Sequence, residues 1–432
     1  MTPGLRPGGL LRQRNFRLLW IGETISGAGS SMAVVGVPLL AVTVLRASTF
    51  AVAALTAAAY LPWLVIGLPA GAWVDRRPVR PLMIACDVLS ALLYASLPAA
   101  AWMGLLHTAQ VVVVALLAGA ANVVFATAYQ VYLPSLVSAA ELVEGNARLQ
   151  AGASVAAIGG RAAAGLAAQA LGAATALLFN AASFGVSAVC LLRIRPPVSS
   201  HARAGGTGAW RGITFVARDP YLRPLTVYGA VANLAYTGNL ALVVVFLIRV
   251  AGLSSAAAGL LIAAGGAGSL PGALLAPRLA RAFGAGRALV LTSLGNGLAG
   301  LLIPLTGGGP RMACYVIGSG LVAGGIAAGN VIAGSFRQRY CPPPLLGRVT
   351  ASMRFLTYGM IPLGALLAGA LGAALGVRDA LWIVQGLFAA SAVLLLTPRI
   401  RAARDLPSYA LTSSPPEGGD SSYPRPVKEA SR

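Results

Sequence analysis

Long runs of apolar residues, separated by short polar segments, occupy most of the chain. A helix needs about 20 consecutive, mostly apolar residues to cross a bilayer, and twelve runs reach that length. We expect twelve membrane-spanning helices, at residues 18–45, 50–74, 82–106, 108–131, 149–170, 173–192, 225–248, 256–280, 288–305, 312–336, 349–375 and 380–396. The fifth and sixth runs are separated only around Gly172, so their boundary carries the weakest signal.

The composition agrees with this pattern. Of the 432 residues, 57% are hydrophobic and 10% are charged, whereas soluble domains are about one quarter charged. An ordinary soluble globule is therefore excluded. The predicted fold class is an all-α integral membrane protein.

The charged residues predict how the chain is oriented. The chain has 32 basic and 11 acidic residues, a net charge of +21, which in a soluble protein would suggest nucleic-acid binding. However, 27 of the 32 basic residues lie on one side of the predicted membrane, together with both termini. Only Arg46, Arg249, Arg311 and Arg378 lie on the other side, and Arg161 lies inside a run. Because basic loops stay in the cytoplasm, we expect cytoplasmic termini, a cell (inner) membrane location and no nucleic-acid partner.

The chain divides into two halves that echo one another. A small residue, a basic cluster and a tight turn recur at residues 71–81 and 272–287, after the second run of each half. This repetition is typical of an internally duplicated transporter. We expect two pseudo-symmetric six-helix bundles. The predicted segments are a cytoplasmic N-terminus (1–17), the first bundle (18–192), a cytoplasmic linker (193–224), the second bundle (225–396) and a largely disordered cytoplasmic tail (397–432).

Several short motifs carry a family resemblance over roughly residues 11–400. They are Gly71…Asp75-Arg76…Arg80, the segments at residues 15–20, 80–87 and 347–356, and Pro362-Leu363-Gly364. Together with the twelve runs, these motifs resemble the major facilitator superfamily. Within it, they are similar to the efflux branch that contains enterobactin exporters and macrolide efflux proteins.

The resemblance implies roles for one loop and two flanking residues. In the family, this loop is thought to latch the inner face shut, which assigns gating to Gly71, Asp75, Arg76 and Arg80. The alternative is that the arginines only fix the orientation. Asp87 and Arg354 also match family positions, about one to two turns inside the boundary. We expect both to be structural or gating residues that reach the interface or pair with the basic loops.

Two charges are expected well inside the membrane. Glu23 lies about 9 Å and Arg161 about 18 Å along their helices, from the usual helical rise. An unpaired charge at such depth costs at least about 2.5–3.5 kcal/mol, so each should face a partner or a wet cavity. Glu23 is a proton-coupling candidate and Arg161 could bind an anionic substrate. The alternative is a static Glu23–Arg161 pair that fixes helix packing. Arg161 also replaces a proline that drug–proton antiporters usually carry at this place.

Uncharged polar and aromatic residues cluster on three runs. Buried amides and hydroxyls in the membrane turn inward, where each forms either an interhelical hydrogen bond or a ligand contact. As a set they predict a mostly apolar pocket that suits amphipathic molecules. The cavity-lining candidates are Asn122, Tyr129, Gln130, Asn233, Tyr236, Asn239 and Asn330.

The sequence lacks the residues that nucleotide binding, metal binding or catalysis would require. Lys428 is the only lysine, so no phosphate-binding Gly-rich loop ending in Lys is present. Two histidines and four dispersed cysteines show no metal spacing, and no nucleophile–base pair suggests catalysis. We therefore expect no enzyme, no catalytic residue, no metal and no cofactor.

The sequence predicts a secondary active transporter. It would export a small amphipathic compound, such as a drug, antibiotic or siderophore-like metabolite, in exchange for protons by alternating access. Its partners would be the substrate, protons and the lipid bilayer, and we expect a monomer. The alternatives are an importer or lysophospholipid flippase of the same fold, and a membrane receptor or scaffold that does not transport.

Overall fold

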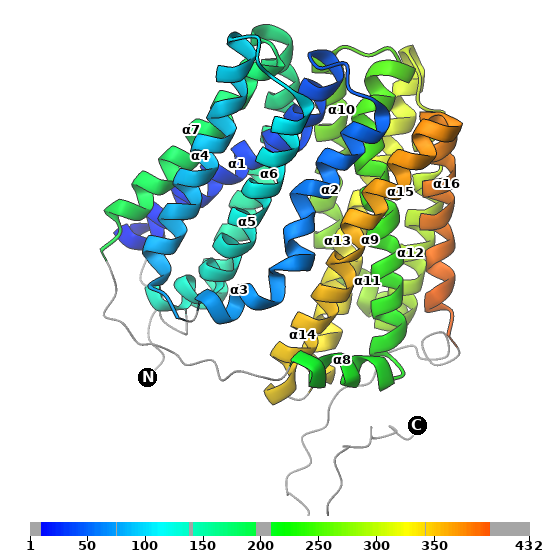
Figure 1. Cartoon of the computed structure of the whole chain (residues 1–432). Coiled ribbons are helices and arrows are strands. Elements are labelled where there is room, and N and C mark those ends of the chain that lie inside the picture. Colours follow the sequence, from blue (N-terminus) through cyan, green and yellow to red (C-terminus); the bar gives the residue numbers. More distant parts are fainter. Residues whose placement is uncertain (1–9, 75, 138–140, 196–208, 342, 398–432) are drawn as a thin grey trace, which may run out of the picture.

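The computed structural model describes residues 10–74, 76–137, 141–195, 209–341 and 343–397, and these fold almost entirely into helices (Figure 1). The apolar runs become helices because hydrocarbon offers the backbone no hydrogen-bond partners. The first half contains α1 (Arg14–Thr43), α2 (Thr49–Val65), α3 (Gly67–Val74), α4 (Val79–Trp102), α5 (Thr108–Leu136), α6 (Leu142–Leu171) and α7 (Ala173–Arg193). The second half contains α8 (Ala209–Arg218), α9 (Leu222–Val245), α10 (Ser255–Ala267), α11 (Ser269–Phe283), α12 (Ala285–Gly300), α13 (Met312–Tyr340), α14 (Pro343–Tyr358), α15 (Met360–Leu375) and α16 (Val377–Ser391).

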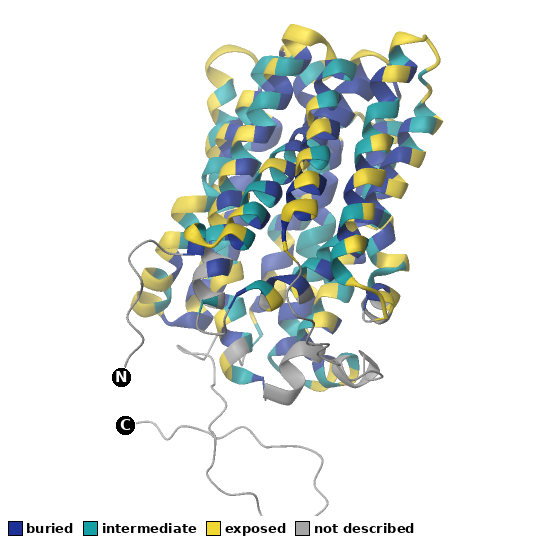
Figure 2. Cartoon of the chain, turned by 90° about the vertical axis from the view of Figure 1, so that its left-hand side faces the viewer, coloured by how far each residue is buried: buried dark blue, intermediate teal, exposed yellow. Residues whose placement is uncertain are grey.

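The predicted fold class is confirmed. Among the described residues, 11 helical segments are long and apolar enough to span a membrane, and α2 is a shorter apolar helix. The weak boundary at Gly172 is also where the structure separates α6 from α7, with a φ of 86° that favours glycine. Exposed positions lie along the outer faces of the helices (Figure 2). One element was not predicted: α8 lies inside the segment assigned to the linker.

Three of the predicted spans are broken in the same way. Proline lacks an N–H, and its ring clashes with the carbonyl four residues earlier. The helices α2, α10 and α14 each end at the residue four positions before a proline, and the next helix begins two residues later. The prolines are Pro69, Pro271 and Pro362. The periodicity of apolar residues does not reveal these breaks, because the runs continue through them.

The two halves meet at one end and separate at the other. A large buried cluster unites residues of both halves, such as Val52, Leu242 and Leu381. Two further clusters belong to one half each: one includes Phe16 and Met83, and the other lies around α8, α13 and the start of α14. In Figure 1 the helices accordingly converge at the top and spread apart at the bottom, where α3, α8 and α14 lie. We call these the closed end and the open end.

Close backbone contacts hold the closed end together. A Cβ on Gly165 of α6 would lie 2.7 Å from Cα of Gly259 in α10, and a Cβ on Gly369 of α15 would lie 2.4 Å from Cβ of Ala53 in α2. Such approaches are possible only where side chains are absent. The guanidinium of Arg249 also donates to the carbonyl of Ala47 at 2.6 Å, across the same junction.

Substitution of Gly165 by alanine should open this end. The new methyl group meets backbone atoms of α10, and overpacking of this kind costs about 1–3 kcal/mol. We expect spin labels at Val44 and Val250, both exposed near the junction, to show a longer distance in Gly165→Ala than in the parent protein. Gly159→Ala on the same helix is the control, because nothing lies within 4 Å of its Cβ position. An unchanged distance in Gly165→Ala would show that the contact does not hold the halves together.

Candidate functional site

A cavity of about 600 Å³ lies within the first half, bounded by α1, α2, α4, α5 and α7, with Leu240 of α9 at its edge. Five residues singled out from the sequence line it. They are Glu23, Asp87, Asn122, Tyr129 and Gln130. Its walls are otherwise apolar or carry hydroxyl groups, so it can hold a molecule of drug size with an apolar body.

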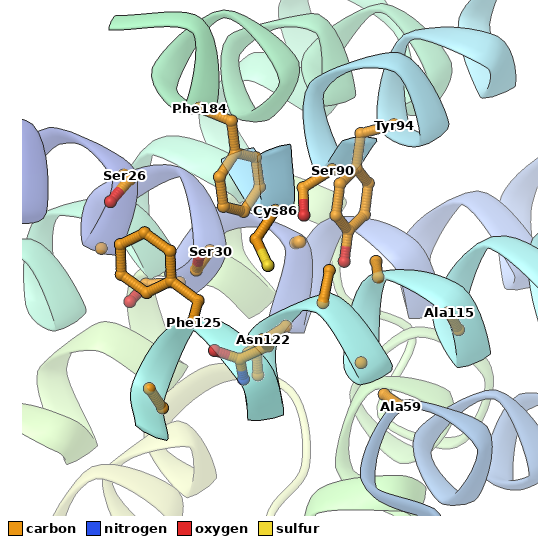
Figure 3. A pocket seen from close by; sticks show the side chains of 18 of the residues that line it. Ser26, Ser30, Ala59, Cys86, Ser90, Tyr94, Ala115, Asn122, Phe125 and Phe184 are labelled. Atoms are coloured by element: carbon orange, nitrogen blue, oxygen red, sulfur yellow. The ribbon is translucent and has the colours of Figure 1, made fainter. Parts of the chain in front are cut away.

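One face of α4 supplies much of the cavity wall. Cys86, Ser90 and Tyr94 follow one another at four-residue spacing, which places them on one side of the helix. Figure 3 shows these side chains directed toward α5, where Asn122 and Phe125 lie. None of the three was predicted from the sequence, although their helical spacing next to Asp87 was a usable signal.

Glu23 and Asp87 share this cavity. The carboxylates lie close enough for their charges to interact. Asp87 is only 2% exposed and accepts a hydrogen bond from Ser187 of α7. Within the described chain, Oε1 of Glu23 and Oδ2 of Asp87 are buried without a hydrogen-bond partner. The sequence led us to expect Asp87 near the basic loops at the membrane boundary. In the structure it lines the first cavity.

Arg161 lies elsewhere, at the junction between the halves. A Cβ on Gly266 of α10 would lie 2.8 Å from its Nη1. The charge of Arg161 acts on Tyr60 of α2 and on Tyr315 of α13. Among the described residues, no hydrogen bond or ion pair joins Arg161 to Glu23. The structure thus lacks the static pair that was one of the alternatives.

A second cavity, of about 460 Å³, lies in the other half. Of the residues expected at the site, it contains Asn233, Tyr236, Asn330 and Arg354. Arg337 of α13 also lines it and was not predicted; its charge interacts with that of Arg354. This cavity is therefore basic where the first one is acidic.

Asn239 has a structural position and lies in neither cavity. Its Oδ1 accepts a hydrogen bond of 2.9 Å from Nε2 of Gln385, which joins α9 to α16. Gln385 is 3% exposed. The sequence left two roles open for each polar residue, an interhelical hydrogen bond or a ligand contact. Asn239 forms the interhelical hydrogen bond.

The loop motif is only partly described. Asp75 lies outside the described residues, Gly71 is within α3, and Arg76 is exposed. Arg80 donates from Nε and Nη2 to the carbonyls of Leu191 and Leu192, at 2.8 and 2.7 Å. Both carbonyls lie in the last turn of α7, and that of Leu191 also accepts the N–H of Ile194. Arg80 therefore ties the start of α4 to the end of α7. Its observed contacts lie within one half.

The described residues contain no group of three or more His, Cys, Asp or Glu side chains that could hold a metal ion. The arrangement of the first cavity suits a different task. It places two carboxylates at depth, beside aromatic and hydroxyl groups, in a space large enough for a small organic molecule.

Comparisons with known proteins agree with this architecture. The model of the Major Facilitator Superfamily matches residues 19–365. Among solved structures, the nucleoside transporter NupG is 13% identical, with a TM-score of 0.71 over 88% of this chain and 97% of that one. A bacterial homologue of the iron transporter ferroportin, in an inward-facing state, is 16% identical, with a TM-score of 0.70 over 90% and 98%.

A third similar structure is a bacterial homologue of the human lysosomal transporter Spinster, inward-facing and unoccupied. It is 15% identical, with a TM-score of 0.66 over 91% of this chain and 96% of that one. At these identities the likeness concerns the fold alone. A search of curated protein sequences found no match.

Loss of the Asn239 amide should destabilise the protein. Asn239→Ala leaves the buried amide of Gln385 without its partner, which costs about 1–3 kcal/mol. We expect the midpoint of thermal unfolding in detergent to fall. Asn233→Ala, in the same helix but facing the second cavity, should leave the midpoint nearly unchanged. Equal midpoints for the two variants would contradict the structural role of Asn239.

Proposed function

This chain belongs to the Major Facilitator Superfamily, and we propose that it is a proton-coupled exporter of a small amphipathic compound. The family consists of transporters and not enzymes, and the many apolar helices make this a multi-pass membrane protein. The export direction, the proton coupling and the kind of substrate are our inferences. The observation that carries them is the buried Glu23 carboxylate in the first cavity, apart from Arg161.

The charge distribution supports an orientation for this exporter. The open end holds the start of α1, α3 and α14, and the loops on that side carry most of the basic residues. Since such loops remain in the cytoplasm, both termini and the open end lie on the cytoplasmic side of the cell membrane. In this conformation the cavity takes up its cargo from the cytoplasm.

Alternating access follows from the arrangement of the halves. At the closed end the halves share one buried cluster and close contacts such as Gly165 against Gly259, and toward the open end each half has a cluster of its own. Rocking one half against the other around a midplane site exposes the cavity first on one side and then on the other. The protein performs this cycle as a monomer, because each cavity is formed within one chain.

Glu23 provides the means of coupling. A carboxylate at this depth is costly when charged and unpaired, by at least about 2.5–3.5 kcal/mol. It therefore binds a proton when the cavity faces the acidic side, and releases it in exchange for cargo on the other. Asn122, Tyr129 and Gln130 line the same cavity and offer hydrogen bonds to the cargo.

Transport in inverted membrane vesicles tests the coupling. With an acid-inside gradient, the parent protein should accumulate an amphipathic fluorescent substrate found by a susceptibility panel in a host lacking its own exporters. Glu23→Gln should transport no faster with the gradient than without it, because the amide cannot carry a proton. Asp379→Asn, an exposed acid at the start of α16, is the matched control and should retain the gradient dependence.

The same assay separates the alternatives. If Glu23→Gln keeps the full response to the gradient, coupling through Glu23 is wrong. Loss of substrate from expressing cells supports export, whereas accumulation in them indicates an importer of the same fold. Movement of a fluorescent lysophospholipid between leaflets, without movement of the dye, indicates a flippase.

A further inference from the structure

The first cavity is acidic in a strongly basic protein. The chain has 11 acidic and 32 basic residues, yet Glu23 and Asp87 both line this cavity, and no Lys, Arg or His is among its described lining residues. Each carboxylate keeps one buried oxygen without a hydrogen-bond partner in the described chain. The two carboxylates also lie close enough for their charges to interact, so they form an acidic pair at this cavity that a positive charge would balance.

Like charges at this depth also repel one another. Asp87 is 2% exposed and its charge acts on Glu23. In a low-dielectric interior this repulsion is screened only weakly. A cation between the two carboxylates turns the repulsion into attraction. The hydrogen bond from Ser187 holds Asp87 in position for this contact.

The remaining wall selects the kind of cation. Five aromatic side chains line the cavity: Tyr60, Tyr94, Phe125, Tyr129 and Phe184. Aromatic faces attract organic cations, and two of these rings, Tyr94 and Phe184, stack with centroids 5.9 Å apart. A protein site for Ca²⁺ is built from several oxygen ligands around one ion, and the described residues hold no group of three His, Cys, Asp or Glu that could serve.

We propose that Glu23 and Asp87 bind the positive group of a lipophilic organic cation, whose apolar body rests against the aromatic wall of the same cavity. This assignment rests on the proposed transport function and names its substrate class. Asp87 is thereby a binding residue and not only a structural one. The second cavity, with Arg337 and Arg354, repels such a compound, so the first half carries the site.

A pair of probes with the same shape and opposite charge tests the proposal. Tetraphenylphosphonium and tetraphenylborate differ mainly in the sign of their charge. Equilibrium dialysis against the purified full chain should show that the phosphonium binds. Glu23→Gln and Asp87→Asn should each weaken its binding by about tenfold, because each substitution removes one negative charge that attracts the cation in a low-dielectric site. Neither substitution should weaken binding of the borate. Asp379→Asn is the matched control and should bind the phosphonium as the parent does.

A conservative pair of variants guards against misfolding. Glu23→Asp and Asp87→Glu keep the charge, so they should retain more phosphonium binding than the corresponding amides. Equal binding of the two probes by the parent protein, or unchanged phosphonium binding in both amide variants, would overturn the proposal.

Cys86 locates the site independently. It lines the cavity beside Asp87, and the other three cysteines, Cys190, Cys314 and Cys341, can be replaced by serine. Bound phosphonium should slow the reaction of Cys86 with an uncharged maleimide, and an unchanged rate would place the cation elsewhere and overturn the assignment. Phosphonium binding without flux would leave this site standing while the proposed export fails. Gradient-driven export of a neutral compound without phosphonium binding would do the reverse.

Discussion

The hydrocarbon interior of a bilayer gives polar groups no partner, and most of this structure follows from that constraint. With 57% hydrophobic and 10% charged residues, the chain satisfies its backbone within helices and directs its few deep charges inward. Glu23 and Asp87 share a cavity, and Arg161 lies at the junction of the halves.

The junction of the halves contains closely packed backbone contacts at one end and broken helices toward the other. At the closed end, glycine contacts bring backbones together. Toward the open end, the halves also meet beside the breaks in α2 and α14. There Trp63 meets Tyr358 edge-on at 5.8 Å, and Leu64 lies against Gly359. Because a proline has removed a helical hydrogen bond at each break, these points can bend while the long helices on either side move as rigid bodies.

Much of the fold was predictable from the sequence, because hydrophobicity over 20 residues is a strong signal. The twelve runs follow from it, and the family follows from these runs together with short motifs such as Gly71…Asp75-Arg76. The breaks before Pro69, Pro271 and Pro362 were not predicted, although the proline positions encode them. The helix α8 was not predicted, because its polar residues within a basic connecting segment resemble those of a loop.

The site was predictable only in part. Residue type identified Glu23, Asn122, Tyr129 and Gln130 as inward-facing, and the structure places them in one cavity. Sequence distance along a helix could not tell which neighbour each charge faces. Glu23 and Arg161 have compatible depths, yet Glu23 lines the first cavity and Arg161 lies against Gly266 of α10. Asp87 was expected near the basic loops for the same reason, since depth alone does not reveal the direction of a side chain.

The most direct test of the account asks from which side the cavity is reached. In a protein whose only cysteine is Cys86, reconstituted in oriented vesicles, a membrane-impermeant thiol reagent should label Cys86 from the side that carries the termini. With Gly165→Ala added, labelling should shift toward the opposite side, because the closed end opens. Labelling from the same side only, at the same rate in both proteins, would contradict a cavity that alternates between the two faces of the membrane.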